Sequence, residues 1–572
     1  MLDRRLHRVS LVLLVLPALV LTAFSLRPSI LPRSAALAPD AFDAAAANAD
    51  LRALAAIPDR APGSAGDEQA ARLVADRFRS AGLKVSIERA ESPTVAGDRE
   101  TTIVRATRTG FSERRVVIAA DRFSPGKGNA GLTGSAALLE LGRAIGGRTL
   151  ARSVEFVSTG AGPGGALAEW KPGGEPPVAT LVLGDLSGTR LSVPYSVPWA
   201  QLRATAAPVA LERSVAAAIA AETGFAKTSN GFLDRALRLA LPITTTPQGP
   251  LVAEGFPAVT MSSSGERGAD PQADAGPLFD SFGRAALRVA GVLDGAPAAW
   301  PGRNSGALPL RDRELPEWTI QLIAAMAVLS ALVTGVDGLA RGRRRKVAVL
   351  EPTFWLLSPW PAFLLGCLWL LFAASVGMIP GAPGATAPPG AVPVSWPAVI
   401  GVPIALAFGW LVLRPVALKA PGRTAEPGPG SPAGLMLVAA IAAGVVAFRD
   451  PLTALLLMPF VHLGPWLADP ARAPSRRISA LVLVATAVPL LVVIGFLAAD
   501  FSTGPLQIAW MLALVFAGGS AGVGGVLITT LFAALFVSVA ILSFQPRPEP
   551  EAVVTTRGPV SYAGPGSLGG TG

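Results

Sequence analysis

From Trp318 onward the sequence is a series of apolar stretches separated by short loops rich in Pro, Gly and Arg. A helix of about 20 apolar residues crosses the ~30 Å hydrocarbon core of a membrane, and these stretches approach or reach that length. Most charged residues lie before Trp318, and hydrophobic residues make up 51% of the whole chain. A wholly soluble protein is therefore excluded, and the chain divides into a polar domain and a membrane domain.

The first apolar run, residues 9–26, follows three arginines and has the layout of a secretory signal or a signal anchor. Its A-x-A-like cleavage site, Ala36-Leu37-Ala38, lies well beyond the run and precedes Pro39, so an uncleaved anchor is favoured over a removed signal peptide. The further candidate spans are residues 318–340, 354–379, 396–413, 433–448, 452–467, 478–497, 506–521 and 526–544. Several are short, which leaves the count of eight open by one or two.

Loop charge indicates the orientation of the spans. Of the 14 Lys and Arg residues after Trp318, 11 lie in three loops, at residues 341–346, 414–423 and 472–477. These loops alternate with loops at residues 380–395, 449–450 and 500, which carry little positive charge. Because positive loops face the cytoplasm, we expect a multi-pass protein with a cytoplasmic N-terminus and residues 39–315 outside the cytoplasm. A high content of Ala, Gly, Pro and Arg with few Lys indicates a gene of high GC content. We therefore expect a bacterial plasma membrane.

These patterns predict four regions. They are an anchor and linker (residues 1–38), an extracytoplasmic domain (39–310), a transmembrane domain of about eight spans (318–544) and a disordered tail (545–572). In the second region helical patterns are expected at residues 67–81, 133–144, 211–222, 232–239 and 277–293, and strands at 84–88, 101–106, 115–120, 153–158, 179–183 and 258–261. Strands alternating with helices predict an α/β sandwich around a mixed sheet, joined to a multi-span α-helical membrane domain.

The chain contains only two histidines, His7 and His462, and one cysteine, Cys367. A disulfide framework, a Cys-based zinc site and a Cys-His dyad are therefore excluded within one chain. His462 is the one ionisable residue clearly inside a span, and a packed residue hydrogen-bonded to a neighbouring helix is favoured over a functional role. The formal charge of +10 is interpreted as the excess of Lys and Arg that marks the cytoplasmic loops of a membrane protein, and not as a surface for nucleic acid. Membrane lipid is therefore an expected partner and nucleic acid is not.

Several short blocks of the polar domain together resemble one family. They are Arg60-Ala61-Pro62-Gly63-Ser64 with the helix after it, and residues 115–121, 128–141, 154–160 and 181–185. Their order and spacing are similar to those of the di-zinc aminopeptidases, the peptidase M28-type family, which also contains glutaminyl cyclase and nicastrin. The overall layout resembles the ectodomain subunit of the GPI transamidase and the membrane metallopeptidases of the endoplasmic reticulum.

The resemblance implies a metal site whose ligands have been replaced. The positions of the family's zinc ligands and general base fall, in chain order, at Asp121, Phe123, Ala130, Ala161, Gly162, Asp185 and Asp270. Only Asp185 keeps the family's residue type, and the polar domain contains no histidine. Zinc is therefore not expected, because a two-zinc site needs carboxylate and imidazole ligands and a base.

Three of these positions carry carboxylates, which leaves a hard-cation site as an alternative. Asp121, Asp185 and Asp270 would suit calcium or magnesium if they converged. The favoured interpretation is that they are ordinary loop-end carboxylates and that Arg122 or Lys127 neutralises the pocket.

The leading functional hypothesis is a catalytically inactive, membrane-anchored pseudoenzyme that acts as an extracytoplasmic binding or scaffolding component of an envelope complex, with a protein partner. One alternative is an active membrane metallo-aminopeptidase, which would need ligands that this chain lacks. Another is a transporter or lipid-handling membrane protein with an accessory exported domain. The scarcity of ionisable residues in the spans weighs against ion coupling but not against lipid handling.

Overall fold

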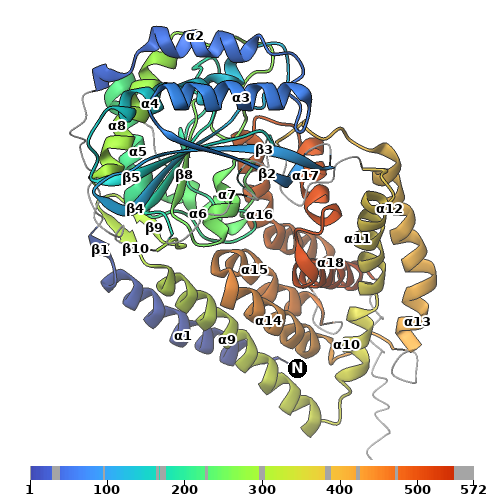
Figure 1. The fold of residues 1–572 in the computed structure, drawn as a ribbon. Helices are drawn as coiled ribbons and strands as arrows, with labels where there is room; N and C mark the ends of the chain where they lie inside the picture. Colours follow the sequence, from blue (N-terminus) through green and yellow to red (C-terminus); the bar gives the residue numbers. More distant parts are fainter. Residues whose placement is uncertain are drawn as a thin grey trace, which may run out of the picture.

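The computed structural model joins an α/β domain to one end of a domain of apolar helices (Figure 1); this second domain holds the candidate membrane spans and is called the membrane domain below. The structure describes residues 2–28, 39–94, 97–162, 167, 170, 176–225, 230–295, 303–379, 388–419, 425–469 and 474–545. The cleavage site at residues 36–38, most of the linker and the tail after residue 545 lie outside the described residues.

The α/β domain is built on a seven-stranded mixed sheet of order β2-β3-β5-β4-β6-β8-β7. The strands are β2 (Lys84–Thr94), β3 (Gly97–Arg108), β4 (Ser112–Asp121), β5 (Arg152–Thr159), β6 (Ala179–Leu183), β7 (Ser196–Val197) and β8 (Ala258–Met261). The four central strands β5, β4, β6 and β8 run parallel, whereas β2, β3 and β7 are added antiparallel. Every strand predicted from the sequence is present.

Helices cover both faces of this sheet. They are α2 (Ala44–Ala55), α3 (Ala65–Ser80), α4 (Thr133–Gly146), α5 (Val209–Thr223), α6 (Phe232–Ala240), α7 (Gln248–Ala253) and α8 (Phe279–Asp294). In β4 the alternate residues Val116 and Ile118 join the larger core, while Val117 and Ala119 join the smaller one on the other face. This two-sided burial explains why the central strands are continuous apolar runs.

In the described part of the chain the membrane domain contains nine helical stretches, and each of the nine predicted spans falls on one of them. They are α1 (Arg4–Phe24), α9 (Glu317–Arg344), α10 (Leu350–Leu357) with α11 (Trp360–Ser375), α12 (Trp396–Phe408) with α13 (Arg414–Lys419), α14 (Ser431–Arg449), α15 (Pro451–Leu467), α16 (Arg476–Asp500), α17 (Pro505–Ala517) and α18 (Gly522–Phe544). Seven of the stretches are long and apolar enough to cross a membrane, while α15 and α17 are shorter. The predicted span at residues 354–379 is interrupted at Pro359, between α10 and α11.

The contacts of the span ends show which loops share a side with the α/β domain. Glu317, at the start of α9, accepts a hydrogen bond from the backbone of Gly306 (2.9 Å). Asp450, after α14, accepts one from the backbone of Ala204 (3.0 Å), and Arg267 donates to the carbonyl of Asp500 at the end of α16 (3.0 Å). The basic residues of α9 and α16 lie at the opposite ends of those two helices, whereas α14 carries Arg449 at the same end as Asp450.

Helix α1 is packed into the membrane domain along α9. Asp3 forms an ion pair with Arg341 (2.7 Å), and His7 Nδ1 lies 3.2 Å from Thr334 Oγ1. The His7 ring lies 5.2 Å from that of His462, so the chain's two histidines meet between α1 and α15. Neither ring nitrogen of His462 has a well-formed hydrogen bond within the described residues, and its backbone partner is Ala327 of the neighbouring helix α9.

Candidate functional site

A pocket of about 490 Å³ opens at the carboxyl ends of the parallel strands β4, β6 and β8. Asp121 ends β4, Asp185 follows β6 by two residues, and Ser262 follows β8. The register pairs Ala120 with Leu183 and Leu183 with Met261, so the three strand ends lie at one edge of the sheet. Asp121 and Asp185, two of the positions at which the resemblance implies metal ligands, both line the pocket.

Asp121 is held by backbone contacts from the loops that follow β4 and β5. Its Oδ1 atom accepts a hydrogen bond from the Phe123 backbone (2.8 Å). Its Oδ2 atom is buried and has no hydrogen-bond partner among the described residues. Burial raises the pKa of this carboxyl group from its ordinary 3.8 to about 7.

Asp185 repeats this arrangement on the neighbouring strand. It is only 6% exposed, and its Oδ1 atom accepts a hydrogen bond from the Ser187 backbone (2.8 Å). Its Oδ2 atom is also buried without a hydrogen-bond partner in the described part of the chain. Burial raises the pKa of the Asp185 carboxyl group, while hydrogen bonds from neighbouring serines oppose that rise.

The third predicted carboxylate, Asp270, does not line the pocket. It lies 3.4 Å from Arg190, and its Oδ1 atom accepts a hydrogen bond from the Gln272 backbone (3.0 Å). Its carbonyl also closes a turn with the backbone of Ala273 (3.2 Å). Within the described residues, no three His, Cys, Asp or Glu side chains are grouped so that they could hold a metal ion.

The other positions at which the resemblance implies metal ligands present carbon in place of donor atoms. The Phe123 ring packs against Gly162, where a Cβ atom would lie 2.7 Å from the ring. Ala130 and Ala161 are both buried, at 0% and 2% exposure. Two carboxylates without imidazole do not match the ligand set of a two-zinc hydrolytic site, and no side chain at these positions could act as its general base.

Arg122 turns away from the pocket that it was expected to neutralise. It is 1% exposed, and its Nε atom donates to Asp67 Oδ1 (2.8 Å). Its two terminal nitrogens donate to the carbonyls of Ser158 (3.1 Å) and Thr102. Lys127 is not among the residues that line the pocket. Arg190 and Arg267 line the pocket, and the charge of the Arg122 guanidinium, although it is turned away, still acts to lower the Asp121 pKa against the effect of burial.

One wall of the pocket comes from the membrane domain. Residues 388–391, between α11 and α12, line the pocket together with residues 265–269 of the α/β domain. The second of these segments is itself fixed to α16, because Arg267 donates to the carbonyls of Asp500 (3.0 Å) and Ala499 (3.3 Å). The neighbouring Glu266 pairs with the buried Arg238, which lies 3.5 Å from the Asp500 carboxylate. The pocket therefore belongs to both domains.

No family model matches the chain, and no curated protein matches it. It is similar to the solved glutaminyl cyclase of Porphyromonas gingivalis, with 18% identity over 45% of this chain and 99% of that chain and a TM-score of 0.35. A zinc-dependent exopeptidase from Parabacteroides distasonis has 14% identity, the same coverages of 45% and 99%, and a TM-score of 0.32. An aminopeptidase of Legionella pneumophila has 12% identity over 45% of this chain and 74% of that chain, with a TM-score of 0.34. The solved structures similar to this chain thus have glutaminyl cyclase and exopeptidase folds, at low identity.

Proposed function

We propose that this chain is a membrane-anchored, non-hydrolytic binding protein of the cell envelope. Its α/β domain would hold a peptide, a protein segment or another envelope component in the pocket at the strand ends. The observation that carries this proposal is the set of apolar residues, Phe123, Ala130, Ala161 and Gly162, at positions where hydrolysis would need metal ligands and a base.

The state of the two pocket carboxylates supports binding. A buried polar atom without a hydrogen-bond partner costs about 1–3 kcal/mol, so such atoms are uncommon in folded proteins. The pocket has two of them, Asp121 Oδ2 and Asp185 Oδ2. A ligand that donates hydrogen bonds to these oxygens would remove that cost. The arginines Arg190 and Arg267 give the same pocket a positive side.

The shared pocket wall supports a role that needs both domains. A ligand in the pocket would touch residues 388–391 of the membrane domain as well as the ends of β4 and β6. Bound ligand would therefore strengthen the contact between the two domains. This is the behaviour of an assembly component more than of a free-standing accessory domain.

The membrane arrangement completes the proposal. The basic ends of α9 and α16 lie away from the α/β domain, so the positive-inside rule would place that domain outside the cytoplasm. The ion pair between Asp3 and Arg341 and the packing of His7 would keep α1 in the protein as a permanent anchor.

Site-specific photo-cross-linking of the full chain in its native membrane tests this function. A photoreactive phenylalanine analogue is placed at position 123 in the pocket or, as the matched control, at Phe111, which is 87% exposed in the turn before β4. We expect position 123 to capture one recurrent envelope component and position 111 not to capture it. Equal products from both positions, or none from position 123, would contradict a binding role for the pocket.

A further inference from the structure

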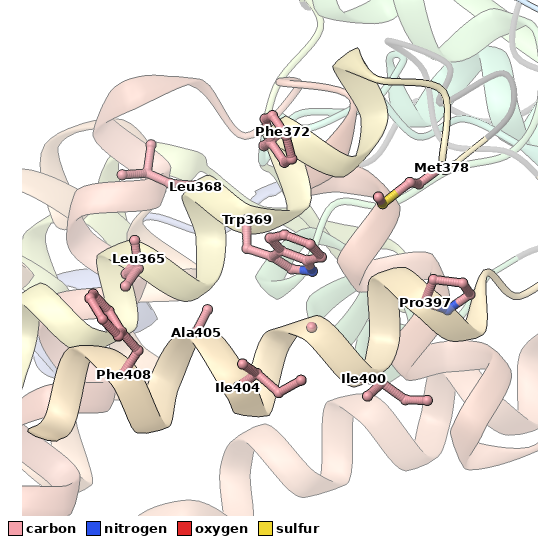
Figure 2. Close-up of a pocket in the computed structure, with 11 residues that line it drawn as sticks. Leu365, Leu368, Trp369, Phe372, Met378, Pro397, Ile400, Ile404, Ala405 and Phe408 are labelled. Atoms are coloured by element: carbon pink, nitrogen blue, oxygen red, sulfur yellow. The ribbon is translucent and has the colours of Figure 1, made fainter.

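A long apolar groove runs between α11 and α12 on the surface of the membrane domain (Figure 2). Its volume is about 650 Å³. It is lined by Leu365, Leu368, Trp369, Phe372, Met378, Pro397, Ile400, Gly401, Ile404, Ala405 and Phe408. The walls therefore present hydrocarbon and aromatic rings.

The floor of the groove depends on one glycine and one tryptophan. The Trp369 indole lies against Gly401, where a Cβ atom would come within 2.1 Å of the ring. The indole Nε1 atom donates to the Ala398 carbonyl (2.9 Å). The polar atom of this side chain is therefore already satisfied, and the ring offers only its apolar surface to an occupant.

The groove is open to the outside of the helical bundle. Leu368, Phe372 and Ile404 are 55%, 51% and 63% exposed, which places them at the surface that faces lipid in a membrane. Helices that pack against one another in membranes meet through small residues that let their backbones approach. Here the rims carry large side chains and the glycine is covered by Trp369, so a flexible hydrocarbon chain fits this groove better than another helix.

The groove has the length of an acyl chain segment, and the helix that forms one wall leads on to a positive charge. From Pro397 to Phe408 it follows about 17 Å of helix, at about 1.5 Å per residue. Arg414 lies six residues further along the chain, after the π-helical turn Gly409–Leu413. Its Nε atom donates to Ser358 Oγ (3.2 Å), and its guanidinium lies 4.3 Å from the centre of the Trp410 ring.

Arg414 has no carboxylate partner within the residues that the structure describes. An arginine at the end of a span is well suited to a phosphate, because its planar guanidinium forms paired, charge-assisted hydrogen bonds. Loop charge predicts that this end of the span faces the cytoplasm, and the cytoplasmic leaflet carries the anionic headgroups.

We propose that the α11–α12 groove and Arg414 form a binding site for one anionic phospholipid. Its phosphate would pair with the Arg414 guanidinium, and one acyl chain would lie along the groove from Phe408 towards Pro397. This site is separate from the pocket in the α/β domain and does not depend on the function proposed for that pocket.

Native mass spectrometry of the full chain in mild detergent tests the site, with phosphatidylglycerol as the probe and phosphatidylcholine as its neutral counterpart. We expect one phosphatidylglycerol to be retained in preference to phosphatidylcholine. R414Q should lower that retention at least about tenfold, since a charge-assisted bond is lost. R343Q, at an exposed arginine ending α9, should leave it unchanged.

A second variant separates loss of the site from a general loss of charge. A405F places a ring in the groove and should reduce retention of phosphatidylglycerol while keeping every arginine. Equal retention of the two lipids by the unmodified chain would overturn the proposal. So would an A405F variant that binds phosphatidylglycerol as well as the unmodified chain does, or a polypeptide held in the groove in place of lipid.

Discussion

The buried ion pair between Arg122 and Asp67 should be a major support of the loop that follows β4. Both side chains are 1% exposed, and Arg122 also satisfies the carbonyls of Ser158 and Thr102. Replacing Arg122 with Met would leave a buried carboxylate and two carbonyls without this donor. Breaking a buried pair on one side costs about 3–5 kcal/mol.

The assay is thermal unfolding of the full chain in detergent, and the readout is the loss of protease resistance of the α/β domain as the temperature rises. For a domain of this size each kcal/mol lowers the midpoint by about 2–4 °C, so Arg122→Met should lower it by roughly 6–20 °C. The double variant Arg122→Met with Asp67→Leu removes both charges and should recover much of that loss. A single variant that unfolds within about 1 °C of the unmodified chain would refute the role of the pair as a support.

Three further predictions concern pH, domain contact and the anchor. Burial raises the Asp121 pKa from 3.8 to about 7, so the folded state binds the proton more tightly than the unfolded state does. The contribution of Asp121 to the free energy of unfolding therefore falls as pH rises from about 4 to about 7. Asp121→Asn should lack that decline when the two proteins are melted over the same pH series, and identical pH profiles would contradict the shift. Arg267→Ala removes both bonds to the end of α16 and should cost about 1–2 kcal/mol in melting experiments. Arg190→Ala breaks a long, partly exposed ion pair with Asp270 and should cost under about 0.5 kcal/mol, so similar losses from the two variants would argue against the domain contact. Intact mass of the chain isolated from membranes should include the residues of α1, and a mass that begins after Ala38 would show that α1 is removed.

Local patterns were sufficient to predict most elements of the fold. β6 and β8 have the predicted bounds because each is a short, fully buried apolar run between turn residues. Helix α2 was missed because its alanines show no apolar periodicity. Its one local signal is Asp43, whose side chain caps the helix by accepting from the backbones of Ala45 (2.9 Å) and Ala46 (3.0 Å).

The candidate site was predictable only in part, because half of it depends on contacts between distant segments. Asp121 and Asp185 follow apolar strands, and such positions meet at one edge of a parallel sheet. The wall formed by residues 388–391 comes from a loop between two spans, and no local pattern links it to β4. The pairing of Arg122 with Asp67 likewise joins residues 55 positions apart, so its direction away from the pocket could not be read from the sequence.

The zinc content and aminopeptidase activity of the purified full chain test the central claim most directly. The chain is incubated with excess zinc, passed through a desalting column, and measured for bound metal and for hydrolysis of aminoacyl substrates, with and without a chelator. The replaced ligand set predicts much less than one zinc ion per chain and no chelator-sensitive hydrolysis. Two zinc ions per chain together with chelator-sensitive turnover would contradict a non-hydrolytic function.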